Sequence, residues 1–144
     1  MVNQDALNKI NSIFEPEFVV GVYLFGSQKK NTTGPLSDYD FGILFKKSYL
    51  KKSRLQKVMH YIPKIAMILR VDENLVDLVD ITDAPFPIAF AAISGRLIYT
   101  KNNIERINFE VKTMAAMQTD GYYIKRDYKF ARAKIASKSY FHVH

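Results

Sequence analysis

Two aspartates separated by a single residue, Asp38 and Asp40, are the residues of this sequence best suited to chemistry. They stand at the start of a short apolar run over residues 39–45, which predicts a strand. Because alternate residues of a strand point to the same face, the two carboxylates project together. Two like charges held close repel each other, and one takes up a proton unless a cation neutralises them. Magnesium is the natural cation, since it prefers oxygen ligands and is typically held by one or two carboxylates together with substrate phosphates.

A third acid, Asp77, lies inside the apolar segment 75–81. A charge inside such a strand is costly unless it is paired or bound to a metal. Asp80 lies nearer the end of the same segment, where we expect solvent to reach it, and its opposite parity directs it to the other face of the strand. We therefore choose Asp77 to complete a metal-binding and catalytic set with Asp38 and Asp40.

Gly26-Ser27 follow directly after the apolar run 18–25. If a helical turn begins there, its free backbone amides face an anion. Glycine lets the backbone approach a phosphate closely, and the serine hydroxyl can donate to a phosphate oxygen. Each feature alone is weak, because a Gly-Ser after a strand is usually a turn and an Asp-x-Asp is usually a turn, a cap or a solvated pair. Their order on these predicted elements is much more specific.

The segments that must position these residues alternate between helical and extended patterns. Apolar spacing predicts helices over residues 4–14 and 49–70, another that begins at Pro85 or Pro87 and ends near Gly95, and a long C-terminal helix from Asn102 or Asn103 to about residue 137. Short apolar runs predict strands over residues 18–25, 39–45, 75–81 and 97–100. Pro63 must kink the helix over 49–70 or split it into two. This order predicts an α/β (α+β) domain whose mixed sheet of four to five strands is flanked by helices.

The composition is that of one soluble globular domain. The chain has 144 residues, of which 48% are apolar and 24% charged, the balance of a folded protein rather than a disordered one. It contains no cysteine, which excludes a disulfide scaffold, a thiolate zinc site and a cysteine nucleophile. The N-terminus lacks the pattern of a signal peptide, and every apolar stretch is far shorter than a membrane span. We therefore expect a cytoplasmic protein without a membrane partner.

The net charge of +7 favours a polyanionic partner such as a nucleotide phosphate, a nucleic acid or an acidic protein surface. The positive charge gathers in two groups. Their members are Lys46, Lys47, Lys51, Lys52, Arg54 and Lys57, and then Lys125, Arg126, Lys129, Arg132, Lys134 and Lys138. Each group is typical of a solvated helix face, and each would also suit the docking of an anionic partner.

Taken together, Gly26-Ser27, ten further residues and then Asp38-Tyr39-Asp40 resemble the signature of the polymerase-beta-like nucleotidyltransferase superfamily. The sequence is most similar to the minimal nucleotidyltransferases, called MNT proteins, and above all to the MNT antitoxins of HEPN/MNT toxin–antitoxin pairs. The stretches 76–79 and 95–99 also look like that family. The resemblance covers residues 18–100 and implies a single nucleotidyltransferase domain over residues 1–144.

The resemblance also implies a role for each residue of the candidate site. In that family the Gly-Ser pair holds the β and γ phosphates of ATP, a role that falls here on Gly26 and Ser27. The first two aspartates bind two magnesium ions, and the third helps to hold the catalytic ion and to activate the acceptor hydroxyl. These roles fall on Asp38, Asp40 and Asp77.

This sequence departs from the family's pattern directly after the serine. Many members carry arginine there, whereas this chain has Gln28. We expect Lys29, or its neighbour Lys30, to supply the positive charge at the phosphates instead. The predicted nucleotide-binding residues are therefore Gly26, Ser27 and Lys29.

The acceptor of the nucleotide is expected to be another macromolecule, because a chain of this length has little room for an acceptor-binding domain. MNT proteins of the similar family pair with a HEPN-domain toxin that is an RNase, and they transfer AMP from ATP to a tyrosine of that toxin. The resemblance therefore implies an antitoxin that acts as a magnesium-dependent protein adenylyltransferase on a HEPN partner. Two alternatives stay open: an antitoxin that inhibits its toxin by binding alone, and a nucleotidyltransferase for a small molecule or an RNA end. Direct nucleic-acid binding is not the expected mode, although the basic groups would suit RNA.

Overall fold

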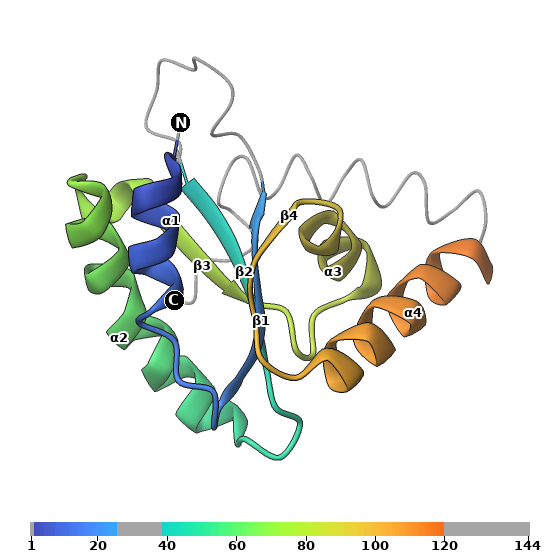
Figure 1. The fold of residues 1–144 in the computed structure, drawn as a ribbon. Helices are drawn as coiled ribbons and strands as arrows, with labels where there is room; N and C mark the ends of the chain where they lie inside the picture. Colours follow the sequence, from blue (N-terminus) through green and yellow to red (C-terminus); the bar gives the residue numbers. More distant parts are fainter. Residues whose placement is uncertain (1, 26–38, 120–144) are drawn as a thin grey trace.

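The computed structural model describes residues 2–25 and 39–119. The helices are α1 (Gln4–Asn11), α2 (Lys51–Leu69), α3 (Phe86–Ile93) and α4 (Asn103–Thr119), with a short 3-10 turn at Glu73–Leu75. The strands are β1 (Val19–Phe25), β2 (Tyr39–Phe45), β3 (Val76–Asp80) and β4 (Arg96–Thr100). The strands form one sheet, which α1 and α2 cover on one face and α3 and α4 cover on the other (Figure 1). This arrangement confirms the predicted α/β class with a helix-flanked mixed sheet.

The sheet has the strand order β3-β2-β1-β4. The central strands β1 and β2 pair antiparallel, and β4 pairs antiparallel with β1, whereas β2 and β3 pair parallel. A parallel pair needs a crossover connection, which α2 supplies between β2 and β3. Because of this crossover, β2 and β3 begin at the same edge of the sheet.

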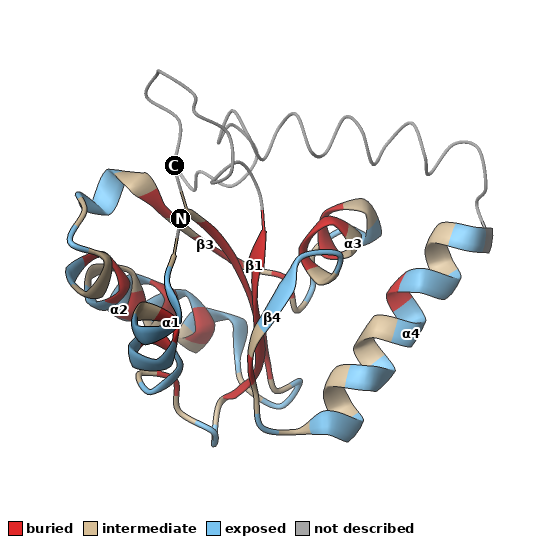
Figure 2. Cartoon of the chain, turned by 45° about the horizontal axis from the view of Figure 1, so that its top comes forward, coloured by how far each residue is buried: buried red, intermediate tan, exposed pale blue. Residues whose placement is uncertain are grey.

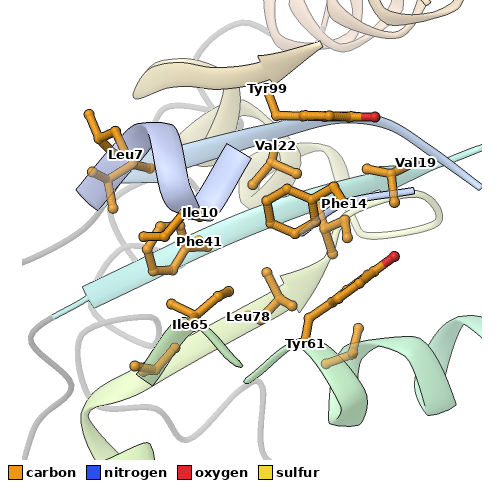
Figure 3. Close-up of a cluster of buried hydrophobic side chains, with 14 of the residues drawn as sticks. Leu7, Ile10, Phe14, Val19, Val22, Phe41, Tyr61, Ile65, Leu78 and Tyr99 are labelled. Carbon is orange, nitrogen blue, oxygen red and sulfur yellow. The ribbon is translucent and has the colours of Figure 1, made fainter. Parts of the chain in front are cut away.

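The face covered by α1 and α2 is filled by large apolar side chains (Figure 3). Ile10 of α1 and Ile65 of α2 are fully buried in one cluster with Phe41 of β2. Phe14 packs edge-on against Tyr61 of α2, with ring centroids 5.1 Å apart. Because burial of apolar surface is the dominant favourable term in folding, this cluster holds both helices on the sheet.

On the face covered by α3 and α4, helix α3 packs on the sheet through small side chains. Ala91 and Ala92 of α3 lie in a second buried cluster together with Tyr23 and Val79 of the sheet. Gly42 of β2 lies under this helix, and a Cβ at Gly42 would be 2.9 Å from the Cβ of Ala92. The absence of a side chain at that position therefore lets α3 approach the sheet closely.

Helix α2 differs from its predicted form. Residues 51–69 form one continuous helix that contains Pro63. Of the two predicted effects of Pro63, a kink or a division, the division into two helices is therefore wrong. Proline cannot donate to the carbonyl of Met59 one turn earlier, but Met59 is exposed, and a backbone carbonyl on the solvent side of a helix can accept from water instead. Tyr61 and Ile65, one on each side of the proline, are fully buried and keep the two halves on the same core.

The ends of α1 and α4 test two further predictions. α1 ends at Asn11 rather than at residue 14. Asn102 caps α4 as predicted, because its Oδ1 accepts a hydrogen bond from the Glu105 N–H at 3.1 Å. The part of the predicted final helix after Thr119 lies outside the described residues.

None of the helices in the described part of the chain is long and apolar enough to cross a membrane.

Candidate functional site

Asp40 and Asp77 stand opposite each other on neighbouring strands. They are register partners in the parallel pairing of β2 with β3, and strands paired in this way lie about 4.8 Å apart. Leu44 and Val79, which share their parity along the two strands, belong to the cluster under α3 and α4. Both aspartates therefore point to that face of the sheet. The fold thus places two of the three predicted carboxylates side by side.

The donor set of Asp40 and Asp77 fits a hard cation. Asp40 is 1% exposed and Asp77 is partly exposed. Two adjacent carboxylates offer only oxygen donors, the ligand type that magnesium prefers. Asp38 lies outside the described residues. Within residues 2–25 and 39–119, no group of three or more acidic, histidine or cysteine side chains is placed to hold a metal ion.

The end of β1 lies beside this pair of aspartates. Phe25, the last residue of β1, is the register partner of Asp40, so Phe25, Asp40 and Asp77 form one row across three strands. Figure 1 shows the edge of the sheet where β1 ends and β2 begins. Gly26-Ser27 follow Phe25 directly in the sequence, while their placement, like that of Lys29, falls outside the described residues. The chain therefore leaves β1 at the row that holds the two aspartates.

Gly95 fixes the end of β1 from the side of α3. It follows the last turn of α3, as predicted, and its N–H donates to the carbonyl of Ala92 at 3.0 Å. A Cβ at Gly95 would lie 2.4 Å from the carbonyl oxygen of Leu24 and 2.7 Å from the Cβ of Phe25. Only glycine allows this approach without displacing the strand. The sequence predicted the end of the helix but not this contact, because the contact joins residues that are far apart in the chain.

Asp80 lies on the opposite face of β3 from Asp77 and belongs to a different network. Its carboxylate pairs with the buried Arg54 of α2 at 2.7 Å and accepts a hydrogen bond from the Thr82 hydroxyl at 2.6 Å. Arg54 also pairs with Asp83 at 2.5 Å. The Asp80 side chain is 25% exposed, so solvent reaches it as expected, but the sequence did not reveal its ion pair with α2. Asp80 thus links β3 to α2 on one face of the sheet, whereas Asp40 points to the other face.

Comparison with known protein families identifies the class of protein. Residues 8–104 match the family model described as Polymerase beta, Nucleotidyltransferase. This match spans more than half of the chain and includes Asp38, Asp40 and Asp77. The protein therefore belongs to the polymerase beta nucleotidyltransferase family, as the sequence resemblance implied.

The fold is similar to that of chains in solved toxin–antitoxin structures. One of these chains belongs to the complex of a tri-AMPylated Shewanella oneidensis HEPN toxin with an MNT antitoxin. Its sequence is 25% identical to this one and the TM-score is 0.56; the match covers 81% of this chain and 87% of that chain. A chain from a mutant toxin–antitoxin structure that contains MntA is also 25% identical, with a TM-score of 0.56. That match covers 83% of this chain and 89% of that chain. A chain from a toxin–antitoxin structure with AMP-PNP is 23% identical, with a TM-score of 0.56. That match covers 82% of this chain and 89% of that chain and shows that the two chains share a fold. No curated protein matches the sequence significantly.

Proposed function

We propose that this chain is a catalytic MNT antitoxin, a magnesium-dependent protein adenylyltransferase that transfers AMP from ATP to a tyrosine of a cognate HEPN-type RNase toxin. The observation that carries the proposal is the register pair of Asp40 and Asp77 beside the end of β1, in a chain of the nucleotidyltransferase family. Similar structures support the choice of acceptor, because one of them holds an AMPylated HEPN toxin with its MNT antitoxin. Another contains AMP-PNP, which supports ATP as the donor.

The three carboxylates divide the chemistry at the transferred phosphate. Asp38, Asp40 and Asp77 would hold magnesium, which would neutralise charge on the departing pyrophosphate and lower the pKa of the acceptor hydroxyl. Asp77 also accepts the proton of the tyrosine hydroxyl. The tyrosine oxygen then bonds to the α phosphorus while the bond from that phosphorus to the pyrophosphate oxygen breaks. The products are an AMPylated tyrosine and pyrophosphate.

The residues after β1 bind the rest of the triphosphate. Gly26 and Ser27 offer backbone amides and a hydroxyl to the β and γ phosphates, and Lys29 adds positive charge. Their position relative to the carboxylates depends on where β1 ends. The contact of Gly95 with Leu24 and Phe25 supports this arrangement, because it fixes that end.

The deciding experiment incubates the purified chain with ATP, magnesium and the HEPN-type protein encoded by the adjacent gene, and then measures the mass of that protein. We expect the wild-type chain to add one or more AMP units and Asp77→Asn to abolish the gain. Asp80→Asn is the matched control on the same strand, because Asp80 points to the other face and pairs with Arg54. It should retain transfer when the assay temperature lies below the unfolding transition of every variant.

The same assay separates catalysis from binding. The proposal is wrong if the wild-type chain adds no AMP to the partner, or if Asp77→Asn adds as much as the wild type. A double variant, Asp38→Asn with Asp40→Asn, tests protection of cells from the toxin. If it protects as well as the wild type, the chain acts by binding alone. AMP found on a small molecule or an RNA end in place of the HEPN-type protein would assign a different acceptor.

A further inference from the structure

Helix α4 turns an apolar stripe toward solvent. Ile104, Ile107, Val111 and Met114 are 76%, 46%, 55% and 45% exposed, and their spacing of three and four residues places them on one face of the helix. We call these four residues the α4 stripe. Among the α4 residues whose burial is described, only Thr113 is buried. Figure 2 shows how much of this helix is exposed in comparison with α3.

The α4 stripe is not what attaches the helix to the sheet. On another side of α4, the hydroxyl of Tyr23 donates to the Glu110 carboxylate at 2.6 Å, and Arg106 pairs with the same carboxylate at 2.8 Å. Burial and then the contact with Glu110 raise the pKa of Tyr23, so its hydroxyl remains a donor. Phe109 adds an apolar contact with the cluster under the helix. A contiguous apolar surface that folding does not use is typical of a protein interaction site.

A cavity of about 540 Å³ lies along the same helix. Phe86 and Phe109 are aromatic residues of its lining, and Asn108 lines it from α4. Because Asn108 is one helical turn from members of the α4 stripe, the cavity adjoins the stripe. Its lining includes the last residues of β2, so it lies away from Asp40 at the start of that strand. A pocket beside an apolar ridge suits a bulky anchor side chain from a partner, the usual form of an interface hot spot.

Positive charge surrounds the stripe and the cavity. Lys47 and Lys112 line the cavity, and Lys46 and Lys101 lie with Ile104 around a shallow hollow at the start of α4. In the described ranges 2–25 and 39–119, none of these four lysines forms an ion pair.

Two acids, Asp83 and Glu105, also line the cavity. Glu105 accepts a hydrogen bond from the backbone N–H of Lys47, and Asp83 pairs with Arg54. The four bordering lysines outnumber these two acids, so the rim of the apolar surface carries net positive charge, and a complementary partner would be acidic.

We propose that the α4 stripe and the adjoining cavity form the docking surface for an acidic protein segment. The segment is an amphipathic helix whose apolar ridge lies along the stripe and whose carboxylates pair with the bordering lysines. One of its bulky side chains enters the cavity. The inference goes beyond the proposed transfer reaction and rests on it only for the choice of the HEPN-type protein as the partner to test.

Charge favours this occupant over those that the protein itself provides. A second copy would bring another net charge of +7 to the same lysines. The chain's own residues 120–144 carry six basic side chains against Asp120 and Asp127, so they too would bring like charge. A nucleic acid would neutralise the lysines but would leave the apolar stripe in water. An acidic amphipathic segment satisfies both the charge and the apolar surface.

The test measures the affinity of the full chain for the HEPN-type protein by calorimetry. Val111→Glu places a charge inside the stripe and Lys112→Glu reverses a bordering charge, and we expect each to weaken binding roughly tenfold or more. The controls, Met67→Glu and Lys51→Glu, alter an exposed apolar residue and an exposed lysine on α2 and should leave the affinity unchanged. Higher salt should reduce the effect of Lys112→Glu more than that of Val111→Glu, because salt screens exposed charges. Thermal unfolding of each variant checks that the fold is intact.

Three results would overturn the docking proposal. The first is unchanged affinity in Val111→Glu and Lys112→Glu, and the second is an equal loss in the Met67→Glu control. The third is a wild-type chain that does not bind the HEPN-type protein. A homodimer of the isolated chain that Val111→Glu dissociates would assign the stripe to a second copy instead. Transfer is a separate readout: if the partner binds through the stripe but gains no AMP, the docking surface stands and only the proposed function fails.

Discussion

Among the described residues, sixteen form the buried cluster on the face of the sheet under α1 and α2, whereas eight form the cluster under α3 and α4. On the first face, the Phe14 ring packs edge-on against Tyr61 of α2 and tilted against Tyr99 of β4. The second contains small residues, a cavity and an exposed apolar helix surface. Asp40 and Asp77 both point to this second face. The larger core and the candidate chemistry therefore lie on opposite sides of one sheet.

This division shows how the packing of one face can serve the chemistry of the other. α2 supplies the crossover that makes β2 and β3 parallel, and its buried side chains hold it on the sheet. Arg54 ties the same helix to Asp80 at the end of β3. Because β3 is held in register from this side, Asp77 stands opposite Asp40 on the other side. The face with α3 and α4 is then free to carry sites that bind other molecules.

The largest expected effect comes from truncating a matched pair of isoleucines, one on each face. Ile65 of α2 is fully buried, whereas Ile107 of α4 is 46% exposed. Ile65→Ala removes buried apolar atoms and leaves a cavity, so it should lower the free energy of unfolding by about 2–5 kcal/mol. Ile107→Ala should change it by less than about 0.5 kcal/mol. Urea unfolding of both variants measures the difference.

Similar losses in the two variants would contradict the contrast between the faces. They would mean that the α4 stripe packs against another part of the chain in solution. A larger loss in Ile107→Ala than in Ile65→Ala would also remove the basis for treating the stripe as a docking surface.

Local patterns in the sequence account for most of the fold. The apolar runs predicted each described strand to within one residue at either end, and for β2 the bounds coincide, because alternation and burial are local properties. Parity also placed Asp77 and Asp80 on opposite faces. The register of β2 with β3 did not follow from the sequence, since a helical crossover separates them and either strand direction suits an apolar run. The row of Phe25, Asp40 and Asp77 is therefore a result of the structure.

The basic group between residues 46 and 57 shows the same limit. Arg54 pairs with Asp80 and Asp83, and Lys57 pairs with Glu15 at 2.7 Å. These two side chains are thus neither a solvated helix face nor a docking surface. Their acidic partners are far away in the sequence, so spacing along the chain does not reveal them. For the nucleotide-binding residues after β1, which lie outside the described residues, the assignment stays a prediction.

A smaller effect is expected where the face with α3 contacts the end of β1. Gly95→Ala forces a Cβ against Leu24 and Phe25, so it should cost about 1–3 kcal/mol of stability. It should also slow AMP transfer by shifting the residues that follow β1. Gly21→Ala is the control, since its Cβ would meet its nearest neighbours at 3.4 Å, an ordinary contact. A wild-type transfer rate in Gly95→Ala would show that this turn does not position the site.

The smallest expected effect is on the pH dependence of stability. Each face of the sheet has a buried tyrosine that donates a hydrogen bond to a carboxylate: Tyr61 donates to Glu15, and Tyr23 donates to Glu110. On the α2 side, the hydrogen bond from Lys57, followed by that from Tyr61, lowers the pKa of Glu15 from its usual value of 4.5. A lowered pKa means that the folded state favours the ionised carboxylate. Glu15 therefore stabilises the fold above about pH 4.5, and this contribution is lost as the pH falls through its folded pKa.

Glu15→Gln removes this titration while it keeps the size of the side chain. The wild type should be more stable than the variant near pH 7, and the difference between their urea midpoints should shrink by about pH 3. We expect a small difference, because the Glu15 side chain is 38% exposed and solvent screens its pairing with Lys57. An equal difference at both pH values would mean that the amide loses packing or hydrogen bonding rather than charge. The charge of Glu15 would then contribute nothing to the stability of the fold.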